Sequence, residues 1–463
     1  MKDQVKQKAL FESQPILRAI LTLAVPTVVG QIILVVYNIA DTFFVGMTGN
    51  DAMVTAVTIC MPAFMFLSAI SNLFGVGGAS VISRALGAQD RARAKNASAF
   101  SFWGCLLLTA VYILGVVFLL NPFIDVLGGS DVQVHGLARG YLLITVVAGG
   151  LFAAMSTFLA HLVRSEGRSI HASAGIAMGG LINIALDPLF MFVLLPKGQE
   201  VAGAALATAT SNLIASAYFA WVVWHGRENS TLRFKPSASM FNDGIASAVL
   251  ACGLPACLMT LFENVSYAVL DNLMAAGGVA MQAGIGVAKK VNMLAHCTVR
   301  GMAQGVLPLI SYNYASGNHQ RMRRAVLIST GISVGLATCC MIANRCFGEY
   351  FVGLFIQEGT TSFNFGVHFL DILCLGCPFS ACAYAVISFF QAVGQGFKSF
   401  LLAILRKGLL DIPMMFLLRL LGSVEGIVWA TPVVDLACCV AAIGLFAAFL
   451  RQYVNHADAP ISA

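Results

Sequence analysis

The feature that most constrains this chain is a series of apolar stretches, each of about 20 residues or more, that recur from about residue 16 to residue 450. An apolar helix of roughly that length can cross the hydrocarbon core of a bilayer. Charged residues make up only 10% of the chain, whereas about 25% is usual for water-soluble domains. The alternating segments of a membrane β-barrel are absent from the sequence, so helices must satisfy the backbone polar groups in lipid. The sequence therefore predicts an all-α integral membrane protein.

Twelve membrane-spanning helices are predicted, six on either side of a polar stretch. The first six are expected near residues 16–46, 52–82, 96–120, 137–162, 170–195 and 203–225. The second six are expected near residues 247–274, 280–312, 322–345, 364–391, 398–420 and 424–450. These ranges predict an N-terminal six-helix lobe at 1–225, a cytoplasmic linker at 226–246 and a C-terminal six-helix lobe at 247–463. The first apolar stretch is too long for a signal peptide, so we expect an uncleaved first span.

The distribution of lysine and arginine predicts the orientation, because cytoplasmic loops of membrane proteins carry an excess of these residues. One side of the predicted bundle carries or adjoins only Arg139, Lys197 and Arg419. The other side carries Lys2, Lys6, Lys8, Arg18, Arg84, Arg91, Arg93, Lys95, Arg164, Arg168, Arg227, Arg233, Lys235, Arg321, Arg323, Arg324, Lys398 and Arg451. Both termini are therefore expected in the cytoplasm, and the chain is expected to be a multi-pass protein of a bacterial cytoplasmic (inner) membrane.

The two halves of the chain carry a repeat with an offset of about 230 residues. The pattern Gly87, Arg91, Arg93 recurs as Gly317, Arg321, Arg323, and Pro26 recurs as Pro255. Because six spans separate equivalent points, the halves have the same orientation and are related by a pseudo-two-fold axis along the membrane normal. The repeat predicts two six-helix bundles with a binding site in the cleft between them.

Ionisable side chains inside a membrane are costly and mark candidate functional sites. The spans of the first half contain Asp41, within YNIADTFFVG, and Asp187, within LINIALDPLF. Asn183 precedes Asp187 by one helical turn, so the two share a helix face. Both spans run outward, and each acid lies roughly 12 Å from the outer end of its span. We take Asp41, Asn183, Asp187 and, in the sixth span, Thr208 as the candidate cation-binding or coupling residues.

Two chemical uses of this pair of acids remain open. Carboxylate and amide oxygens suit a hard cation, and Asp41, Asn183 and Asp187 would be metal ligands if the ion is Na⁺. Alternatively, burial and mutual repulsion let the pair hold a proton and release it when the surroundings change. Asn38 and Thr42, which flank Asp41, are possible further oxygen donors. Without a transport role, the acids would serve only as hydrogen-bonding partners between helices, with about 0.6 kcal/mol for each.

The second half contains both acids and bases inside its predicted spans. The acids are Glu263, Asp271, Asp371 and Asp411, and the candidate counter-charges are Lys289, Lys290, Arg300, Arg406 and Lys407. Self-neutralising ion pairs would explain this set without any role in transport. Glu263 lies near the middle of its span and is placed to meet a cationic substrate. The candidate substrate-binding residues are Tyr37, Asn38, Glu263 and Asp271.

Other functions are disfavoured by missing motifs. The sequence has no GxxxxGK[ST] nucleotide-binding loop and no HExxH metal site, so neither an enzyme nor a cofactor is predicted. His161, His171 and His296 are isolated in the sequence, and we interpret them as packing or loop residues. Energy would come from an ion gradient or from the substrate itself. The expected partners are small organic solutes, the coupling cation and the bilayer, without nucleic acid, for a monomeric protein.

Several segments together resemble the multidrug and toxic compound extrusion (MATE) family, and in particular its bacterial drug-exporting branch. In the first half they are PTVVGQIILVVYNIADTFFVG, GGASVISRALGAQDRARAK, NIALDP and GAALATATSN; in the second half they are GLPACLMTLFENVSYAVLD and GVLPLISYNYASGNHQRMRRA. The resemblance implies a V-shaped pair of bundles that exports cationic or amphipathic drugs and metabolites in exchange for Na⁺ or H⁺. It implies a cation site at Asp41, Asn183 and Asp187, with Thr208 as the motif threonine and Glu263 in a helix that carries an acid in some members.

The predicted function is therefore cation-coupled antiport of organic solutes by alternating access. One alternative is a flippase for a lipid-linked oligosaccharide, which would need several arginines along the cleft. The cavity-forming spans of the first half show no such basic set, although Lys289 and Lys290 leave room for this alternative. A dedicated exporter of one metabolite is the other alternative that the sequence leaves open.

Overall fold

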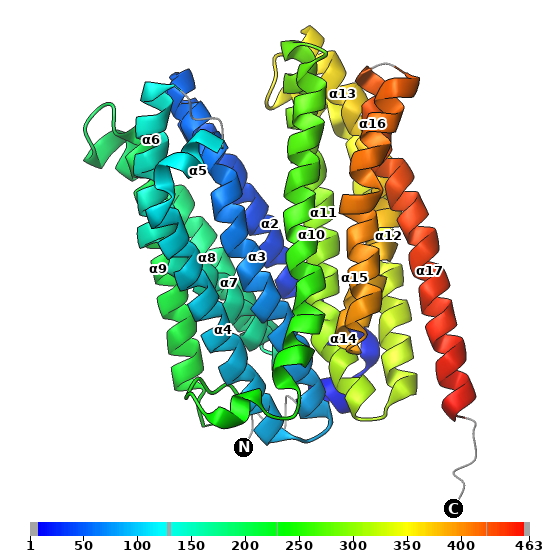
Figure 1. Cartoon of the computed structure of the whole chain (residues 1–463). Helices are drawn as coiled ribbons and strands as arrows, with labels where there is room; N and C mark the ends of the chain where they lie inside the picture. The colour runs from blue at the N-terminus through cyan, green and yellow to red at the C-terminus, as the bar shows by residue number, and fades with distance from the viewer. Residues whose placement is uncertain (1–7, 127–130, 229, 423, 458–463) are drawn as a thin grey trace, which may run out of the picture.

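A computed structural model describes residues 8–126, 131–228, 230–422 and 424–457 of the chain. Within these ranges every regular element is a helix, and the helices form two bundles side by side (Figure 1). The bundles lie close together at the end where α2 begins and α17 ends, which we call the terminal end. They diverge toward the opposite end, which gives the molecule the shape of a V (Figure 1).

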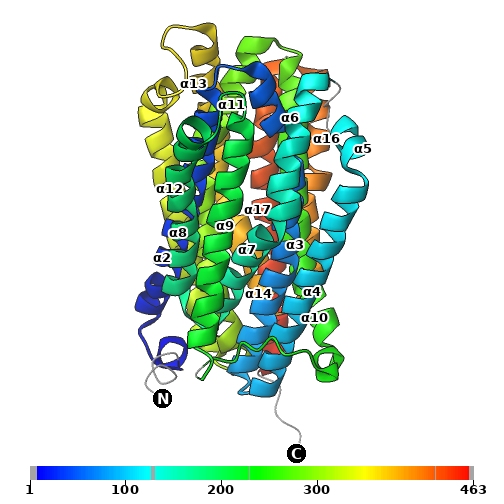
Figure 2. The ribbon, with the colours of Figure 1, turned by 90° about the vertical axis from the view of Figure 1, so that its left-hand side faces the viewer.

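The first bundle contains the helices from α2 to α9, and Figure 2 shows it from its outer side. Its elements are α2 (Ile16–Gly46), α3 (Asp51–Gly87), α4 (Arg91–Phe118), α5 (Leu120–Val126), α6 (Val132–Leu142), η1 (Leu143–Ala148), α7 (Gly150–Ser165), α8 (Ser169–Pro188), η2 (Leu189–Leu194) and α9 (Glu200–His225). The second bundle contains α10 (Ile245–Ala275), α11 (Val279–Ala315), α12 (His319–Gly353), α13 (Thr361–Leu373), η4 (Cys374–Gly376), α14 (Cys377–Ala392), α15 (Gly396–Ile404), η5 (Leu405–Leu409), α16 (Asp411–Leu421), η6 (Val424–Trp429) and α17 (Ala430–Ala457). The short helix η3 (Ala238–Phe241) lies between the two bundles in the chain.

Twelve helical rods result, as the sequence predicts. In the described ranges, nine helices are long and apolar enough to cross a membrane, and α6–η1 with α7 makes a tenth that bends by 48°. The polar helix α11 and the interrupted rod α15–η5–α16 complete the set. The bend in the fourth rod occurs at Gly149, and the sequence analysis did not predict it.

The internal repeat is visible in the caps of equivalent helices. Asp90 caps α4 by accepting a hydrogen bond from the backbone N–H of Arg93. Asn318 caps α12 in the same way, with the N–H of Arg321 as donor. Both helices follow the basic loop that the repeat places after the second span of each half, so the two halves share local structure as well as order.

Glycines let the two bundles approach each other backbone to backbone. The main contacts between the bundles join α3 to α10 and α2 to α11. A Cβ atom added at Gly253 of α10 would collide with the carbonyl of Leu73 in α3, and one at Gly305 of α11 would lie 2.7 Å from the Cα of Ala24 in α2. Such close contact requires residues without a side chain.

We expect Gly253→Ala to destabilise this arrangement of the bundles. The new methyl group has no space against the backbone of α3, and overpacking of this kind costs about 1–3 kcal/mol. Gly331→Ala is the matched control, because Gly331 lies inside α12 with no neighbouring atom within 4 Å of a new Cβ; this control should gain up to about 1 kcal/mol. Thermal unfolding in detergent would measure both, and equal effects of the two variants would contradict the assigned contact.

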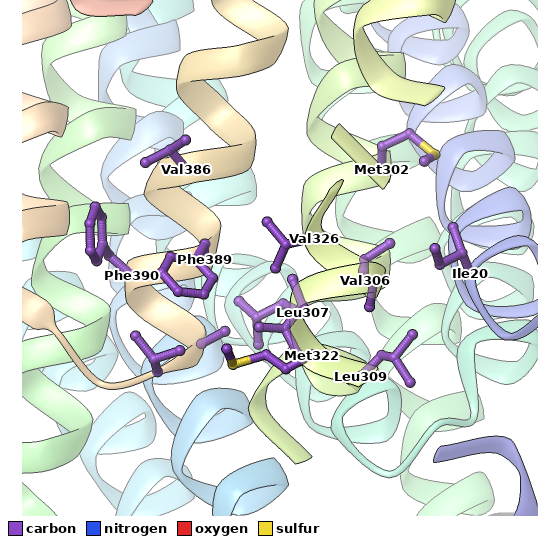
Figure 3. Close-up of a cluster of buried hydrophobic side chains, with 14 of the residues drawn as sticks. Ile20, Met302, Val306, Leu307, Leu309, Met322, Val326, Val386, Phe389 and Phe390 are labelled. Carbon is purple, nitrogen blue, oxygen red and sulfur yellow. The ribbon is translucent and has the colours of Figure 1, made fainter. Parts of the chain in front are cut away.

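An apolar cluster supports the same interface near the terminal end. Ile20 of α2 packs with Met302 and Val306 of α11, and the cluster continues through Val326 of α12 to Phe389 of α14 (Figure 3). All five side chains are buried. Between membrane helices such a cluster stabilises the interface through close van der Waals packing of its side chains.

Candidate functional site

The acid of the fifth span lies where the regular helix ends. Asp187 and Pro188 are the last two residues of α8, and the chain continues as the π-helical turn η2. Proline has no backbone N–H and cannot extend the α-helical hydrogen-bond ladder, which favours a wider turn at this point. The change of helix type places Asp187 beside an irregular backbone segment inside the first bundle.

Asn183, Asp187 and Thr208 meet between α8 and α9. The Asn183 side-chain amide donates to Oδ1 of Asp187 and to Oγ1 of Thr208, each at 3.4 Å. All three side chains are buried. Oδ1 of Asn183 and Oδ2 of Asp187 are buried and accept no hydrogen bond from any residue that the structure describes. Two oxygen atoms are therefore available at this point for a cation or a proton.

Asp41 of α2 extends this cluster from a second helix. Its Oδ1 atom is also buried and has no hydrogen-bond partner within the described ranges. Asp41 lies close enough to Asp187 for their charges to interact, and Tyr37 and Tyr141 lie within electrostatic reach of both acids. Tyr141 comes from α6, and the sequence analysis did not single it out because a tyrosine in a membrane helix carries no spacing signal.

We call Asp41, Asn183 and Asp187 the first-bundle acidic site. Neither aspartate forms an ion pair within the described ranges. Buried oxygens without donors are costly, because each loses water and gains nothing in return. The site can recover that cost by binding a hard cation through its oxygens or by taking up a proton.

The two polar residues near Asp41, Asn38 and Thr42, form hydrogen bonds to backbone carbonyls of their own helix. Thr42 is exposed, and its hydroxyl donates to the carbonyl of Asn38 on its own helix. The Asn38 amide likewise donates to the carbonyl of Leu34. The suggestion that these two residues add oxygens to the site stays a prediction.

The acids of the second bundle are paired with bases. The Glu263 carboxylate accepts from Arg300 at 2.6 Å, Asp271 pairs with Lys289, and Lys407 lies 2.8 Å from Asp411. Asp371 lies 4.0 Å from Arg345, near the surface. The structure thus places each of the four predicted acids in an ion pair. This is the arrangement expected if these acids serve only to neutralise nearby bases and have no role in transport. Lys290 forms no ion pair in the described ranges.

The repeat shows how the two bundles differ. Tyr267 and Asp271 of α10 occupy the positions of Tyr37 and Asp41 of α2, 230 residues earlier in each case. The ammonium groups of Lys289 and Lys407 lie over the Tyr267 ring, 5.4 and 5.5 Å from its centroid. Lysine cations therefore occupy the part of the second bundle that corresponds to the first-bundle acidic site.

A second buried pair was missed by the sequence analysis. Arg406, on the π-helical turn η5, donates to Asp435 of α17 at 2.8 Å, and both side chains are almost fully buried. The guanidinium lies over the ring of Tyr384, 4.4 Å from its centroid. Asp435 interrupts the apolar stretch ATPVVDLACCV, and an acid in such a context is itself a signal for a buried partner.

A cavity lies between the bundles, with residues of both in its wall. Its walls are Asn72, Val76, Ala79, His161, Arg164, Ala256, Met259, Thr260, Glu263, Arg300, Ala303, Gln304, Leu307, Pro308, Tyr384, Ile387, Ser388 and Gln391. Of the four predicted substrate residues, the structure places only Glu263 in this wall. Tyr37 lies beside the first-bundle acidic site, Asn38 is on the same helix, and Asp271 belongs to the lysine-paired cluster.

Two residues of α7 in this wall form a contact that was not predicted. Arg164 was assigned to a basic loop, but it is only 2% exposed and lies within α7. His161, interpreted as a packing or loop residue, is buried within α7, where it accepts from Arg164 and contacts Asn72. The first bundle therefore contributes a basic group to the cavity.

Comparison with known proteins identifies the class to which this fold belongs. The family model described as MatE matches residues 26–189 and matches again at residues 255–417. The double match reproduces the internal repeat. Two bundles with buried acids and a cavity between them are the architecture of a membrane transporter, and the chain belongs to the MATE family of multidrug efflux transporters.

Curated relatives and solved structures agree with this assignment. The multidrug export protein MepA of Staphylococcus saprophyticus is 29% identical over 447 residues, which is 96% of either chain. MepA of Staphylococcus aureus is 28% identical over 449 residues, again 96% of either chain. A multidrug resistance MATE family transporter in an outward-facing conformation has the same fold, with a TM-score of 0.87 and 23% identity over 97% of this chain and 99% of its own.

Proposed function

We propose that the protein is a cation-coupled antiporter that exports organic solutes, with the coupling reaction at the first-bundle acidic site. The observation that supports this most is the contrast between the bundles. Three buried oxygens of Asp41, Asn183 and Asp187 have no hydrogen-bond partner in the described part of the chain. In contrast, Glu263 and Asp411 of the second bundle are neutralised by Arg300 and Lys407. A site that lacks its counter-charge is the one that can take up a cation from solution.

In this proposal Na⁺ or H⁺ binds between α2 and α8. Binding removes the repulsion between Asp41 and Asp187 and lets the two helices move closer together. Pro26 lies inside α2 and removes one hydrogen bond from it, so this helix can bend at low cost when its other half moves. A shift of α2 changes the shape of the surface that the first bundle presents to the space between the bundles, and this change expels the substrate. No cofactor takes part.

The proposed setting follows the charge distribution. The terminal end carries the basic loops and would face the cytoplasm of a bacterial inner membrane. The V then opens to the outside. The partners are small organic solutes, the coupling cation and lipid, and the protein works as a monomer without nucleic acid. The three proposed parts are residues 1–225, 226–246 and 247–463.

The flippase alternative is less well supported. A pyrophosphate carries several negative charges and would need several uncompensated arginines along the cavity. Arg164 and Arg300 line the cavity, but Glu263 neutralises Arg300. One uncompensated arginine suits a single anionic group and not a pyrophosphate.

Transport by purified protein in liposomes tests the proposed function. A fluorescent organic solute is loaded, and a Na⁺ gradient or an H⁺ gradient is imposed, one at a time. One of the two gradients should drive solute movement against its concentration, and collapse of that gradient with an ionophore should stop it. Movement that is indifferent to both gradients would overturn the coupling.

A further inference from the structure

The side chain of Arg164 is buried in the wall of the cavity, with no counter-charge among the residues that the structure describes. It is 2% exposed, and its Nε and Nη2 atoms have no hydrogen-bond partner among those residues. The carboxylate nearest in sequence, Glu166, instead accepts hydrogen bonds from Ser230 and Thr231. A buried guanidinium with two idle donors is costly unless an anion pairs with it.

The remaining contacts of Arg164 hold it in place without neutralising it. Its Nη1 atom donates to Nδ1 of His161 at 3.3 Å. Because a guanidinium has only donors, the His161 proton resides on Nε2, which donates to Oδ1 of Asn72 at 3.2 Å. Asn72 in turn donates to the hydroxyl of Thr260 at 2.9 Å, across the interface between the bundles. His161, Asn72 and Thr260 are all neutral, and their series of hydrogen bonds fixes the orientation of the Arg164 side chain toward the cavity.

The other charges of the cavity wall cancel. Arg300 donates to Glu263 at 2.6 Å, and the wall contains no other carboxylate among the described residues. Arg164 therefore leaves the cavity with one excess positive charge. This result opposes the expectation that Glu263 would attract a cationic substrate, because the carboxylate already has its cation.

We infer that Arg164 is the anchor for an anionic group, of the carboxylate class, on the exported solute. The inference rests on the proposed function and specifies its substrate. Two parallel N–H groups of a guanidinium match the two oxygens of a carboxylate. The apolar wall formed by Val76, Met259, Leu307 and Ile387 accepts the flat, apolar body of the same solute. The substrate class is thus an amphipathic carboxylic acid, with or without a distant amine.

Equilibrium binding to the purified protein in detergent tests this assignment. Three probes share one ring system and differ in charge: 1-naphthaleneacetate, 1-naphthaleneacetamide and 1-naphthalenemethylamine. The wild-type protein should bind the carboxylate roughly tenfold or more tightly than the amide and the amine, as a charge-assisted pair requires. Arg164→Gln should remove that preference, and Arg164→Lys should keep part of it.

Arg168→Gln is the matched control. It removes the same charge four residues further along the chain, at the start of α8, from a residue that contacts the carbonyl of Val222 and does not line the cavity. Its binding preference should equal that of the wild type. Tightest binding of the amine, or an unchanged preference in Arg164→Gln, would overturn the inference. If Arg164→Gln does not fold, the order of the three probes on wild-type protein still decides. Failure of the proposed function would appear separately, as carboxylate binding without gradient-driven transport.

Discussion

Asp41→Asn should abolish coupled export, with a fall in transport of more than about tenfold, while the protein still inserts and folds. Asparagine keeps the size of the side chain but offers neither the charge that binds a cation nor a site for a proton. The unpaired Oδ1 atom of Asp41 is a cost to the empty protein, so the variant should be at least as stable as the wild type. Solute efflux from liposomes and thermal unfolding in detergent measure the two effects.

Asp51→Asn is the control for this prediction. Asp51 is an exposed acid at the start of α3, ten residues after Asp41. Its replacement removes the same charge and should leave transport unchanged. Wild-type export by Asp41→Asn would remove this residue from the coupling reaction.

Lys407→Met should destabilise the protein by about 3–5 kcal/mol, because it leaves the Asp411 carboxylate buried without its counter-charge. Lys407 and Asp411 are 2.8 Å apart and their side chains are 3% and 1% exposed. Ser266 would remain as a donor to Asp411, but one hydroxyl does not replace an ammonium group. The double variant Lys407→Met with Asp411→Asn should recover most of the loss. Thermal unfolding in detergent measures the series.

The exposed pair of Lys8 and Glu12 provides a control for the second prediction. These groups are 3.8 Å apart and largely open to solvent, so Lys8→Met should cost less than about 1 kcal/mol. A loss in Lys407→Met as small as that in Lys8→Met would show that the buried pair does not stabilise the second bundle.

The spans and their order were predictable because lipid imposes a length and an apolar composition on each helix. The fourth rod shows the limit of that reasoning. Its 48° bend depends on Gly149, where an added Cβ would lie 2.9 Å from Cβ of Ala209 in α9. Such a contact between distant segments leaves no trace in local hydropathy, so a single straight span was expected.

The candidate site was predictable in part. The spacing of Asn183 and Asp187 places them on one face of any helix, and the structure joins them by a hydrogen bond. The approach of Asp41 to the same point depends on how α2 packs against α8. The sequence indicated only that the two aspartates lie at a similar depth in the membrane. Their roles in coupling stay predictions.

Charge alone misled the sequence analysis at Arg164. A basic residue near the end of a span is typical of a cytoplasmic loop, and nothing local distinguishes Arg164 from Arg168. Its burial results from the packing of α7 against other helices, chiefly α3, α8 and α9 of its own bundle. Asp435 differs, because an acid inside an apolar span already indicates a buried partner, and Arg406 on η5 is that partner.

Gradient-driven transport by two neutralised variants tests the central claim most directly. Asp41→Asn with Asp187→Asn removes the charge of the first-bundle acidic site, and Lys407→Met with Asp411→Asn removes a neutral pair from the second bundle. The first variant should lose all dependence of transport on the Na⁺ or H⁺ gradient, and the second should keep it. Gradient dependence that persists in the first variant, or disappears only in the second, would place the coupling site in the other bundle and contradict this account.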